Sequence, residues 1–355
     1  MRSVDNARAF ASAMLSVAVV PVITGIVSPH VSIKVLEAQG LVWVSLLTLA
    51  YMSSRAVASI IHAGLYRVLS AKYLGLLGLL LITSSYALYA SMPESTYPVI
   101  KLLEGFAAGI FWPLMQTLVV DSVKPEWRSR WMSIYFIIGS LSLYVGFQVG
   151  SLIISVAGRG TVVWAGTVLC IAYAVIYLLV APYRSFRTEP ARRVPVIAAL
   201  SELRKVTPYL PVILLVGSVN GLMKDYLFAY TKRVTGMNEV QLRNYWSLAG
   251  YAGLVLSYLL AHMQEVMGKT REVLIISSAL VASASLMIVV SDPAAVFAIL
   301  TATTVGLRVI RPVLRGVVSN AVSKPEHGIA IVNAFSNIAA GASPLLIALI
   351  GAALS

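Results

Sequence analysis

The sequence predicts an all-α, polytopic membrane protein built from two parallel repeats of about six transmembrane helices. Hydrophobic residues make up 59% of its 355 residues and charged residues only 12%, which is more apolar than a soluble domain of this length requires. Runs of about twenty apolar residues recur along the chain, the length that crosses a bilayer as a helix. Lys-Pro-Glu at 124–126 returns at 324–326, and Pro113 is echoed by Pro312, which indicates a duplicated unit.

Eleven apolar runs are long enough to span a bilayer. They lie at 9–28, 40–62, 73–91, 98–120, 131–155, 160–182, 208–230, 243–263, 272–290, 294–319 and 328–354. The longest connection, 183–207, contains two prolines and six cations. We therefore expect an N-terminal six-helix half over 1–182, a cytoplasmic linker over 183–207, and a C-terminal half over 208–355 with five helices.

The repeat extends to the connections. The basic inner turn at 64–72 has its counterpart at 261–271, and the outer segment at 35–51 has its counterpart at 235–251. Parallel repeats joined by a long inner linker are a common plan among membrane transporters.

The placement of Lys and Arg predicts the orientation. With the N-terminus inside, the inner segments carry 16 of the 27 cations, the outer segments five and the spans six. Because cations concentrate in cytoplasmic segments, we expect a multi-pass protein of the cytoplasmic membrane with a cytoplasmic N-terminus. The net charge of +13 is dispersed in short runs, so we expect no nucleic-acid partner.

Several kinds of chemistry have no support in the sequence. The single cysteine, Cys170, excludes an intrachain disulfide, and the four histidines at 30, 62, 262 and 327 show no metal-ligand spacing. No phosphate-binding loop of the GxxxxGK[ST] type occurs. We therefore expect no cofactor, no metal and no nucleotide-driven pumping.

The inner turns carry a weak motif. In the second half, Glu265, Gly268 and Lys269 fit the pattern Gly-x-x-x-Asp-Arg-x-Gly-Arg, with Glu in the Asp position. In the first half, Gly64, Arg67 and Lys72 are compatible with the pattern, but Val68 stands where Asp belongs and Ala71 where the second Gly belongs.

Two spans add further motifs. Lys101-Leu-Leu-Glu104-Gly105-Phe-Ala-Ala108 is similar to Arg-x-x-x-Gly-x-x-x-Ala, with Ala108 one position before the Ala of the pattern. The fifth span has three glycines (139, 146 and 150) without the accompanying Pro. With these motifs, the chain resembles the major facilitator superfamily (MFS) of secondary transporters over nearly its whole length. The resemblance implies an MFS-like fold, a monomer, and twelve helices. The counterpart of the 160–182 span would begin beyond Ser355, so the twelfth helix is expected to be lacking.

The tenth and second spans contain candidate solute-binding cations. Arg308, Arg311 and Arg315 share one helical face, and arginine suits anionic groups. Arg308 is too deep to reach the interface easily, whereas snorkelling also accounts for Arg315. Arg55 lies beyond the middle of the second span with no acid near it in sequence. We expect Arg308, Arg311 and Arg55 to contact a solute, with an acid on another helix as the alternative partner of Arg55. The arginines of the tenth span favour an anionic solute.

The fourth and seventh spans contain the candidate proton carriers, Glu104 and Asp225. A carboxylate with apolar surroundings and a nearby cation suits a proton-coupled step, although a static ion pair between spans is an equally good interpretation. Lys101, at i,i+3 from Glu104, is expected to pair with it or to contact the solute. The aromatic residues Phe111, Trp112 and Tyr226 are expected to line the pathway, with helix packing as the alternative.

An inner gate is implied by the resemblance. An acidic residue at the inner end of the fourth helix pairs in this family with basic residues of the inner turns. Asp121 stands at that position, with Arg67 and Arg128 as partners, and Glu265 and Lys269 occupy the matching turn of the second half. A solvated helix-end acid explains Asp121 equally well.

These residues predict a secondary active transporter, not an enzyme, whose partners are a small organic solute, protons and the lipid bilayer. Rocking of one repeat against the other would give alternating access, and we expect proton-coupled efflux by an antiporter. Two alternatives stay open. One is a lipid-handling membrane enzyme that uses the arginines to hold a phosphate head group, and the other is a non-transporting sensor or scaffold.

Overall fold

The fold is all-helical throughout the residues that the structure describes. A computed structural model describes residues 2–65, 69–124, 127–183, 202–322 and 325–354, and no strand occurs among them. The chain divides into two compact units. Unit 1 comprises Met1–Ala191 with Glu239–Asn244, and unit 2 comprises Arg192–Asn238 with Tyr245–Ser355.

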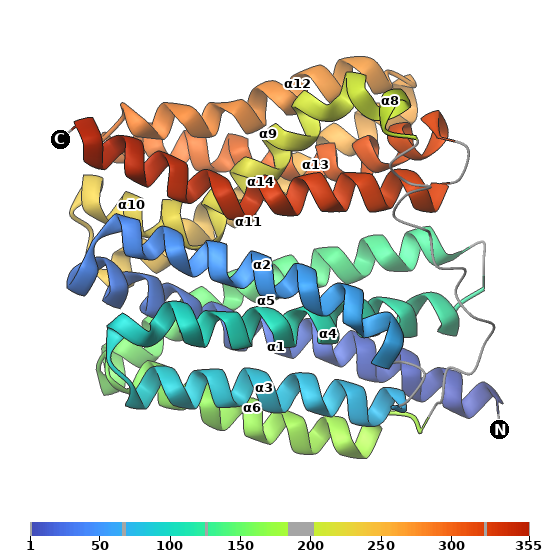
Figure 1. The fold of residues 1–355 in the computed structure, drawn as a ribbon, viewed down its shortest axis with the longest axis horizontal. Helices are drawn as coiled ribbons and strands as arrows, with labels where there is room; N and C mark the ends of the chain where they lie inside the picture. The colour runs from blue at the N-terminus through green and yellow to red at the C-terminus, as the bar shows by residue number, and fades with distance from the viewer. Residues whose placement is uncertain (1, 66–68, 125–126, 184–201, 323–324, 355) are drawn as a thin grey trace. The chain divides into compact units, whose positions relative to one another are not determined.

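The described residues of unit 1 form six long helices, which are labelled in Figure 1. They are α1 (Arg2–Gln39), α2 (Leu41–Leu65), α3 (Ala71–Ser91), α4 (Tyr97–Ser122), α5 (Arg128–Ala157) and α6 (Thr161–Val180).

The described residues of unit 2 form five helical segments of comparable length, some of them composite, and the first turns of α11 (Glu239–Asn244) belong to unit 1. The first runs from α8 (Leu203–Val206) through α9 (Leu210–Gly221), a π-helical turn (Leu222–Tyr226) and α10 (Leu227–Thr235). The others are α11 (Glu239–Met267), α12 (Thr270–Ala282) with a 3₁₀ turn (Ser283–Ile288), α13 (Pro293–Ala321) and α14 (Pro325–Leu354).

Each predicted span falls on one of these helical segments, which confirms the predicted fold class. Ten segments are long and apolar enough to cross a bilayer, counting described residues only. The predicted span at 243–263 lies on α11, which is not among those ten. Most of the linker predicted at 183–207 lies outside the described residues.

The first helix is much longer than the predicted span of 9–28. It continues to Gln39 through Pro21 and Pro29. The sequence criterion stopped at Ser28 because polar residues follow, but Val31, Ile33 and Val35 in that continuation are fully buried. Packing therefore extends the helix where hydropathy alone predicts a loop, and proline is tolerated in such helices because neighbouring helices satisfy the backbone.

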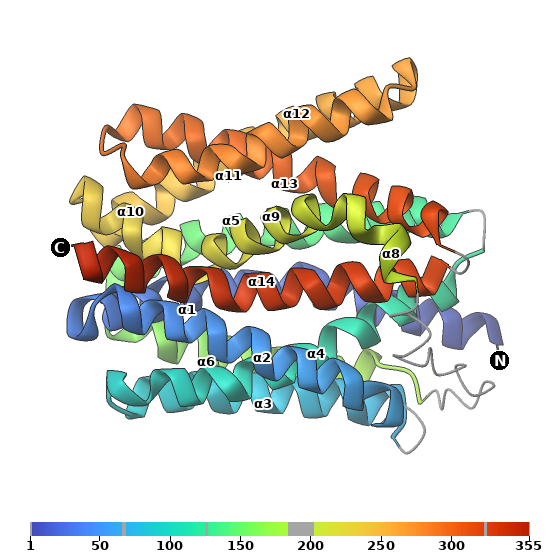
Figure 2. The same cartoon turned by 45° about the horizontal axis from the view of Figure 1, so that its top comes forward.

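Glycines bring pairs of helices into close backbone contact. A Cβ atom on Gly25 would collide with the Leu143 carbonyl, and one on Gly146 would collide with the Val22 carbonyl, so α1 and α5 pack backbone to backbone. Gly105 places α4 equally close to Tyr51 of α2. In unit 2, α9 lies along α14 (Figure 2). Small residues at helix contacts are the usual means of packing helices in a bilayer.

The outer surface of α6 is suited to lipid. It exposes a series of large apolar side chains: Trp164, Val168, Leu169, Ile171, Val175, Ile176 and Leu179. In water such a surface would be a strong aggregation site, whereas in a bilayer it contacts acyl chains.

The close approach of α1 and α5 predicts the effect of filling it. Gly146→Ala should lower the free energy of unfolding by about 1–3 kcal/mol, because the added methyl group forces the two backbones apart. Gly160→Ala is the matched control, since a Cβ atom at Gly160 meets nothing within 4 Å and should change stability by less than about 0.5 kcal/mol. Unfolding in mixed micelles measures both, and equal stability of the two variants would contradict the packing.

Candidate functional site

A buried ion pair lies inside α4 of unit 1. Lys101 is completely buried and Glu104 is 5% exposed, and Lys101 Nζ lies 3.0 Å from Glu104 Oε2. The i,i+3 spacing places both side chains on one side of the helix. Unpaired, either charge would be costly in the interior of a membrane protein, and the contact between the two groups offsets part of that cost.

Neighbouring helices hold this pair in place. The Tyr89 hydroxyl of α3 donates to Glu104 Oε2 at 3.0 Å, and Tyr97 fixes Tyr89 by donating to its carbonyl at 2.6 Å. Lys101 Nζ donates to Ser28 Oγ of α1 at 3.4 Å. It also lies 5.8 Å from the Tyr51 ring centroid and 5.9 Å from that of Tyr89, within the range of cation–π attraction.

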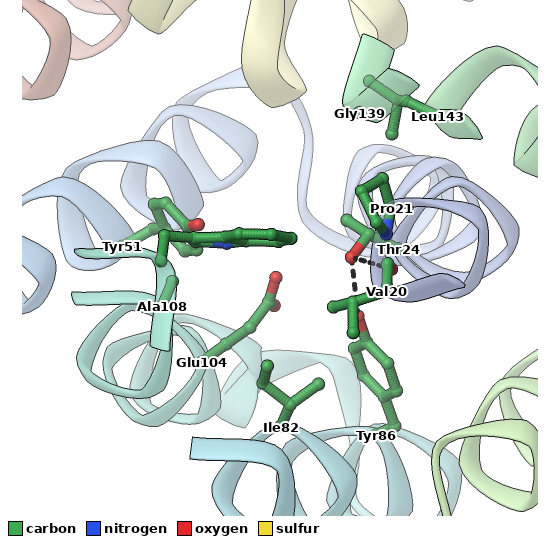
Figure 3. A pocket seen from close by; sticks show the side chains of 11 residues that line it. Val20, Pro21, Thr24, Tyr51, Ile82, Tyr86, Glu104, Ala108, Gly139 and Leu143 are labelled. Carbon is green, nitrogen blue, oxygen red and sulfur yellow. Dashed lines mark hydrogen bonds between the residues drawn. The ribbon is translucent and has the colours of Figure 1, made fainter. Parts of the chain in front are cut away.

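A cavity of about 120 Å³ adjoins the pair, and the Glu104 carboxylate points into it (Figure 3). Five helices of unit 1 supply its walls. The lining residues are Val20, Pro21, Thr24, Tyr51, Ile82, Tyr86, Glu104, Ala108, Trp112, Gly139 and Leu143. Opposite Glu104, the Thr24 hydroxyl lies 3.3 Å from the Tyr86 hydroxyl. The cavity thus combines one carboxylate and a hydroxyl pair with aromatic and aliphatic walls, which is the usual make-up of a small-molecule site.

The other candidate residues of unit 1 have different surroundings. Trp112 lines the cavity. Phe111 does not line it: Phe111 is fully buried, packs against Gly78 and lies 6.4 Å from the Tyr177 ring centroid. The guanidinium of Arg55 is half-buried and lies 6.0 Å from the ring centroid of Tyr51, a cavity residue.

In unit 2, the second candidate proton carrier lies on irregular helix. Asp225 is completely buried, and it belongs with Tyr226 to the π-helical turn Leu222–Tyr226. The Tyr226 ring stacks on that of Tyr230 at 6.1 Å between centroids. Single π-helical turns occur often at functional sites, so this turn is the natural place to look for chemistry in unit 2.

The arginines of α13 differ in burial. Arg308 is half-buried, whereas Arg311 and Arg315 are exposed. Arg311 donates to the side-chain carbonyl of Asn220, and Arg315 donates to that of Asn333 at 3.3 Å. The sequence did not single out these two amides.

The predicted inner gate is only partly described. Asp121 is exposed, and among the described residues it forms no ion pair. Arg128 is exposed and donates through Nε to the Val120 carbonyl at 3.1 Å, near the end of α4. Arg67 and the side chain of Glu265 lie outside the described residues, and Lys269 is exposed. The gate therefore stays a prediction.

A second buried charge network in unit 1 was missed by the sequence. Arg243 is 0% exposed and donates to Glu239 Oε1 through Nε at 3.1 Å and Nη2 at 2.8 Å. His30 Nδ1 lies 3.1 Å from Glu239 Oε1 and 3.2 Å from Oε2. Arg159 donates to Glu239 Oε2 at 2.9 Å and to Glu37 Oε2 at 3.0 Å. Both oxygens of Glu239 are thereby occupied.

The charges in this network stabilise each other. Burial raises the pKa of the Glu239 carboxyl, but His30 and Arg243 outweigh burial and hold that pKa well below its usual range. Burial lowers the pKa of Arg159, while Glu37 and Glu239 raise it above its usual value. The i,i+4 spacing of Glu239 and Arg243 was visible in the sequence, but nothing in it indicated that His30 or Arg159 would join them.

Within the described ranges, no group of three or more His, Cys, Asp or Glu side chains is placed to hold a metal ion. The site's chemistry is that of ion pairs, hydroxyl groups and aromatic rings.

The helical fold and the comparison with known proteins identify the chain as a membrane transporter. The sequence profile of the Major Facilitator Superfamily matches residues 7–344. The chain therefore belongs to the major facilitator superfamily, and it is a transporter rather than an enzyme. This confirms the family resemblance and excludes the lipid-handling enzyme.

Solved transporter structures share the fold. A nucleoside transporter, NupG, superimposes with a TM-score of 0.72 at 13% identity, covering 96% of this chain and 90% of that chain. A bacterial homologue of the human lysosomal transporter Spinster, in an inward-facing and unoccupied conformation, gives 0.73 at 12% identity, with 98% and 83% coverage. A peptide transporter, POT, in complex with alafosfalin gives 0.69 at 14% identity, with 98% and 92% coverage. No curated protein matches the chain.

The buried pair predicts a non-additive stability effect. Glu104→Leu alone should lower the free energy of unfolding by about 3–5 kcal/mol, because Lys101 is left buried without its counter-charge. The double variant Lys101→Met, Glu104→Leu should recover most of that loss, because it removes both charges. Glu94→Gln, which breaks the half-exposed pair with Lys34, should cost at most about 1 kcal/mol.

Unfolding in mixed micelles measures all three variants. A double variant as unstable as Glu104→Leu would show that the charges are not energetically paired.

Proposed function

We propose that the chain is a secondary active transporter that moves a small organic solute across the cytoplasmic membrane in exchange for protons, in the efflux direction. Alternating access between the two repeats would carry the solute, and the N-terminus would be cytoplasmic. The observation that supports this most is the position of Glu104. Its carboxylate is buried in a spanning helix, paired with Lys101 and directed into a cavity. Ionisable groups in such places mark proton and substrate pathways.

Proton binding at Glu104 would change the charge balance of its buried pair with Lys101. Protonation neutralises the carboxylate and removes the counter-charge of the completely buried Lys101 ammonium, so proton uptake would be coupled to a change in the surroundings of Lys101. A solute that donates a hydrogen bond to the same carboxylate favours its charged form and so opposes protonation. Proton and solute therefore compete for one group, and competition of this kind is the basis of exchange transport.

Unit 2 would supply the second set of functional residues. Asp225, completely buried on its π-helical turn, is the second proposed proton carrier. Arg308 and Arg311 on α13, Arg55 on α2 and Tyr226 are the proposed solute contacts outside the cavity. Asp121, Arg67, Arg128, Glu265 and Lys269 are proposed as an inner gate, on the strength of the family motif.

Proton flux in proteoliposomes tests the function. Purified protein is reconstituted with an internal pH-sensitive dye, a pH gradient is imposed, and organic anions, neutral aromatic compounds and aromatic amines are added in turn. At least one class should release protons through the wild-type protein. Glu104→Gln and Asp225→Asn should abolish the solute-dependent flux, because neither amide takes up a proton. Glu94→Gln should retain the flux, since Glu94 is half-exposed and pairs with Lys34.

Two outcomes would contradict the proposal. Solute-dependent proton flux that persists in both amide variants would remove Glu104 and Asp225 as carriers. The absence of any solute or proton movement, with folded protein in the vesicles, would favour a non-transporting sensor or scaffold on the same fold.

A further inference from the structure

The two oxygens of the Glu104 carboxylate are not equivalent. Oε2 receives both internal partners, the Lys101 ammonium at 3.0 Å and the Tyr89 hydroxyl at 3.0 Å. Oε1 has no hydrogen-bond partner among the described residues, although the carboxylate points into the cavity (Figure 3). A buried carboxylate normally has its acceptor capacity filled. Oε1 is therefore an acceptor that a bound molecule can use.

Glu239 provides a comparison within the same unit. Its Oε1 accepts from Arg243, its Oε2 accepts from Arg159, and His30 lies within 3.2 Å of both oxygens. That carboxylate has no oxygen left for a ligand. Of these two networks among the described residues of unit 1, the one at Glu104 combines an open oxygen with a cavity.

The negative Glu104 carboxylate at the cavity wall determines which charge a bound molecule can carry. Lys101 is completely buried and does not line the cavity, so a bound molecule meets the carboxylate side of the pair. An N–H or O–H donor would satisfy Oε1, and a cationic donor would gain most, because hydrogen bonds to charged groups are the stronger ones. An anionic group would face a carboxylate at close range and be repelled. The prediction of an anionic solute came from arginines of α13, none of which lines this cavity.

The other side chains that line the cavity are mostly aromatic or aliphatic and favour an apolar ring. Tyr51, Tyr86 and Trp112 provide aromatic surfaces, and Val20, Ile82 and Leu143 are among the aliphatic ones. The volume of about 120 Å³ is close to that of an engineered cavity of about 150 Å³ that holds benzene. The cavity is therefore of the size of one ring, with the polar substituent of the ring directed at Glu104.

We propose that this cavity is a subsite for an aromatic ring that carries a neutral or cationic hydrogen-bond donor, which Glu104 Oε1 accepts. The inference rests on the proposed function, since it names the chemical class of the transported solute or of the part of it that unit 1 holds. Anionic rings and rings without a donor are discriminated against at this subsite.

Equilibrium dialysis with four small probes tests the subsite. Radiolabelled benzylamine, benzyl alcohol, anisole and benzoate are equilibrated with the full chain in nanodiscs, and binding to empty nanodiscs is subtracted. Benzylamine and benzyl alcohol should bind at least about tenfold more tightly than anisole, which lacks the donor, and than benzoate, which is anionic. Equal binding of anisole and benzyl alcohol, or tighter binding of benzoate than of benzylamine, would overturn the proposal.

A cavity-filling variant locates the binding. Ala108→Leu adds volume at the cavity wall without altering Lys101 or Glu104, and it should reduce binding of benzylamine at least about tenfold. Val99→Leu adds one methylene on the exposed surface of the same helix and should leave binding unchanged. Benzylamine binding that survives in a folded Ala108→Leu variant would place the ligand elsewhere and overturn the proposal.

The dialysis separates this proposal from the transport proposal. Binding of benzylamine that Ala108→Leu abolishes supports the subsite even if no proton flux is found, in which case only the proposed function fails. Proton flux driven by organic anions, together with no binding of benzylamine or benzyl alcohol, overturns the subsite and leaves the transport function standing.

Discussion

An ammonium group and a carboxylate 3.0 Å apart inside α4 impose the main constraint on unit 1. Each charge alone would cost several kcal/mol in the interior of a membrane protein, so the surrounding helices must keep the two together. Gly105, next to Glu104, lets α4 approach the backbone of Tyr51, and this contact brings the Tyr51 ring near Lys101. Tyr97 orients Tyr89, which completes the coordination of Glu104 Oε2.

Glu239 and Glu104 are both buried carboxylates of unit 1, and a buried carboxylate needs hydrogen-bond donors. The two differ in how many of their oxygens have one. Glu239 is surrounded by His30, Arg159 and Arg243, and a carboxylate with all its acceptor sites filled is suited to fixing helices in place. Glu104 has one oxygen filled and one directed at a cavity, and a carboxylate of this kind is suited to exchanging partners. Both carboxylates are buried, so the two networks differ in coordination more than in burial.

Local features of the sequence predicted the fold well. Hydropathy over about twenty residues, and short motifs that recur about 200 residues later, can be recognised without knowing which helices touch. Hydropathy failed at the end of α1, where packing buries a stretch that contains His30 and Lys34. The i,i+3 spacing predicted the pairing of Lys101 with Glu104, but the cavity could not be predicted, because five helices distant in sequence contribute to it. The contact of His30 with Glu239 joins residues 209 positions apart, and no local pattern encodes it.

The central claim is that Glu104 takes up a proton from the cavity and that a donor-bearing solute competes for the same oxygen. Infrared difference spectroscopy of the protein in lipid, labelled with carbon-13 at the glutamate carboxyl groups, observes this directly. On acidification the labelled glutamates give carboxylic-acid carbonyl bands. One component should be missing from the spectrum of Glu104→Gln, and benzylamine should diminish that same component at constant pH. A band that is the same in Glu104→Gln and insensitive to benzylamine would contradict the account.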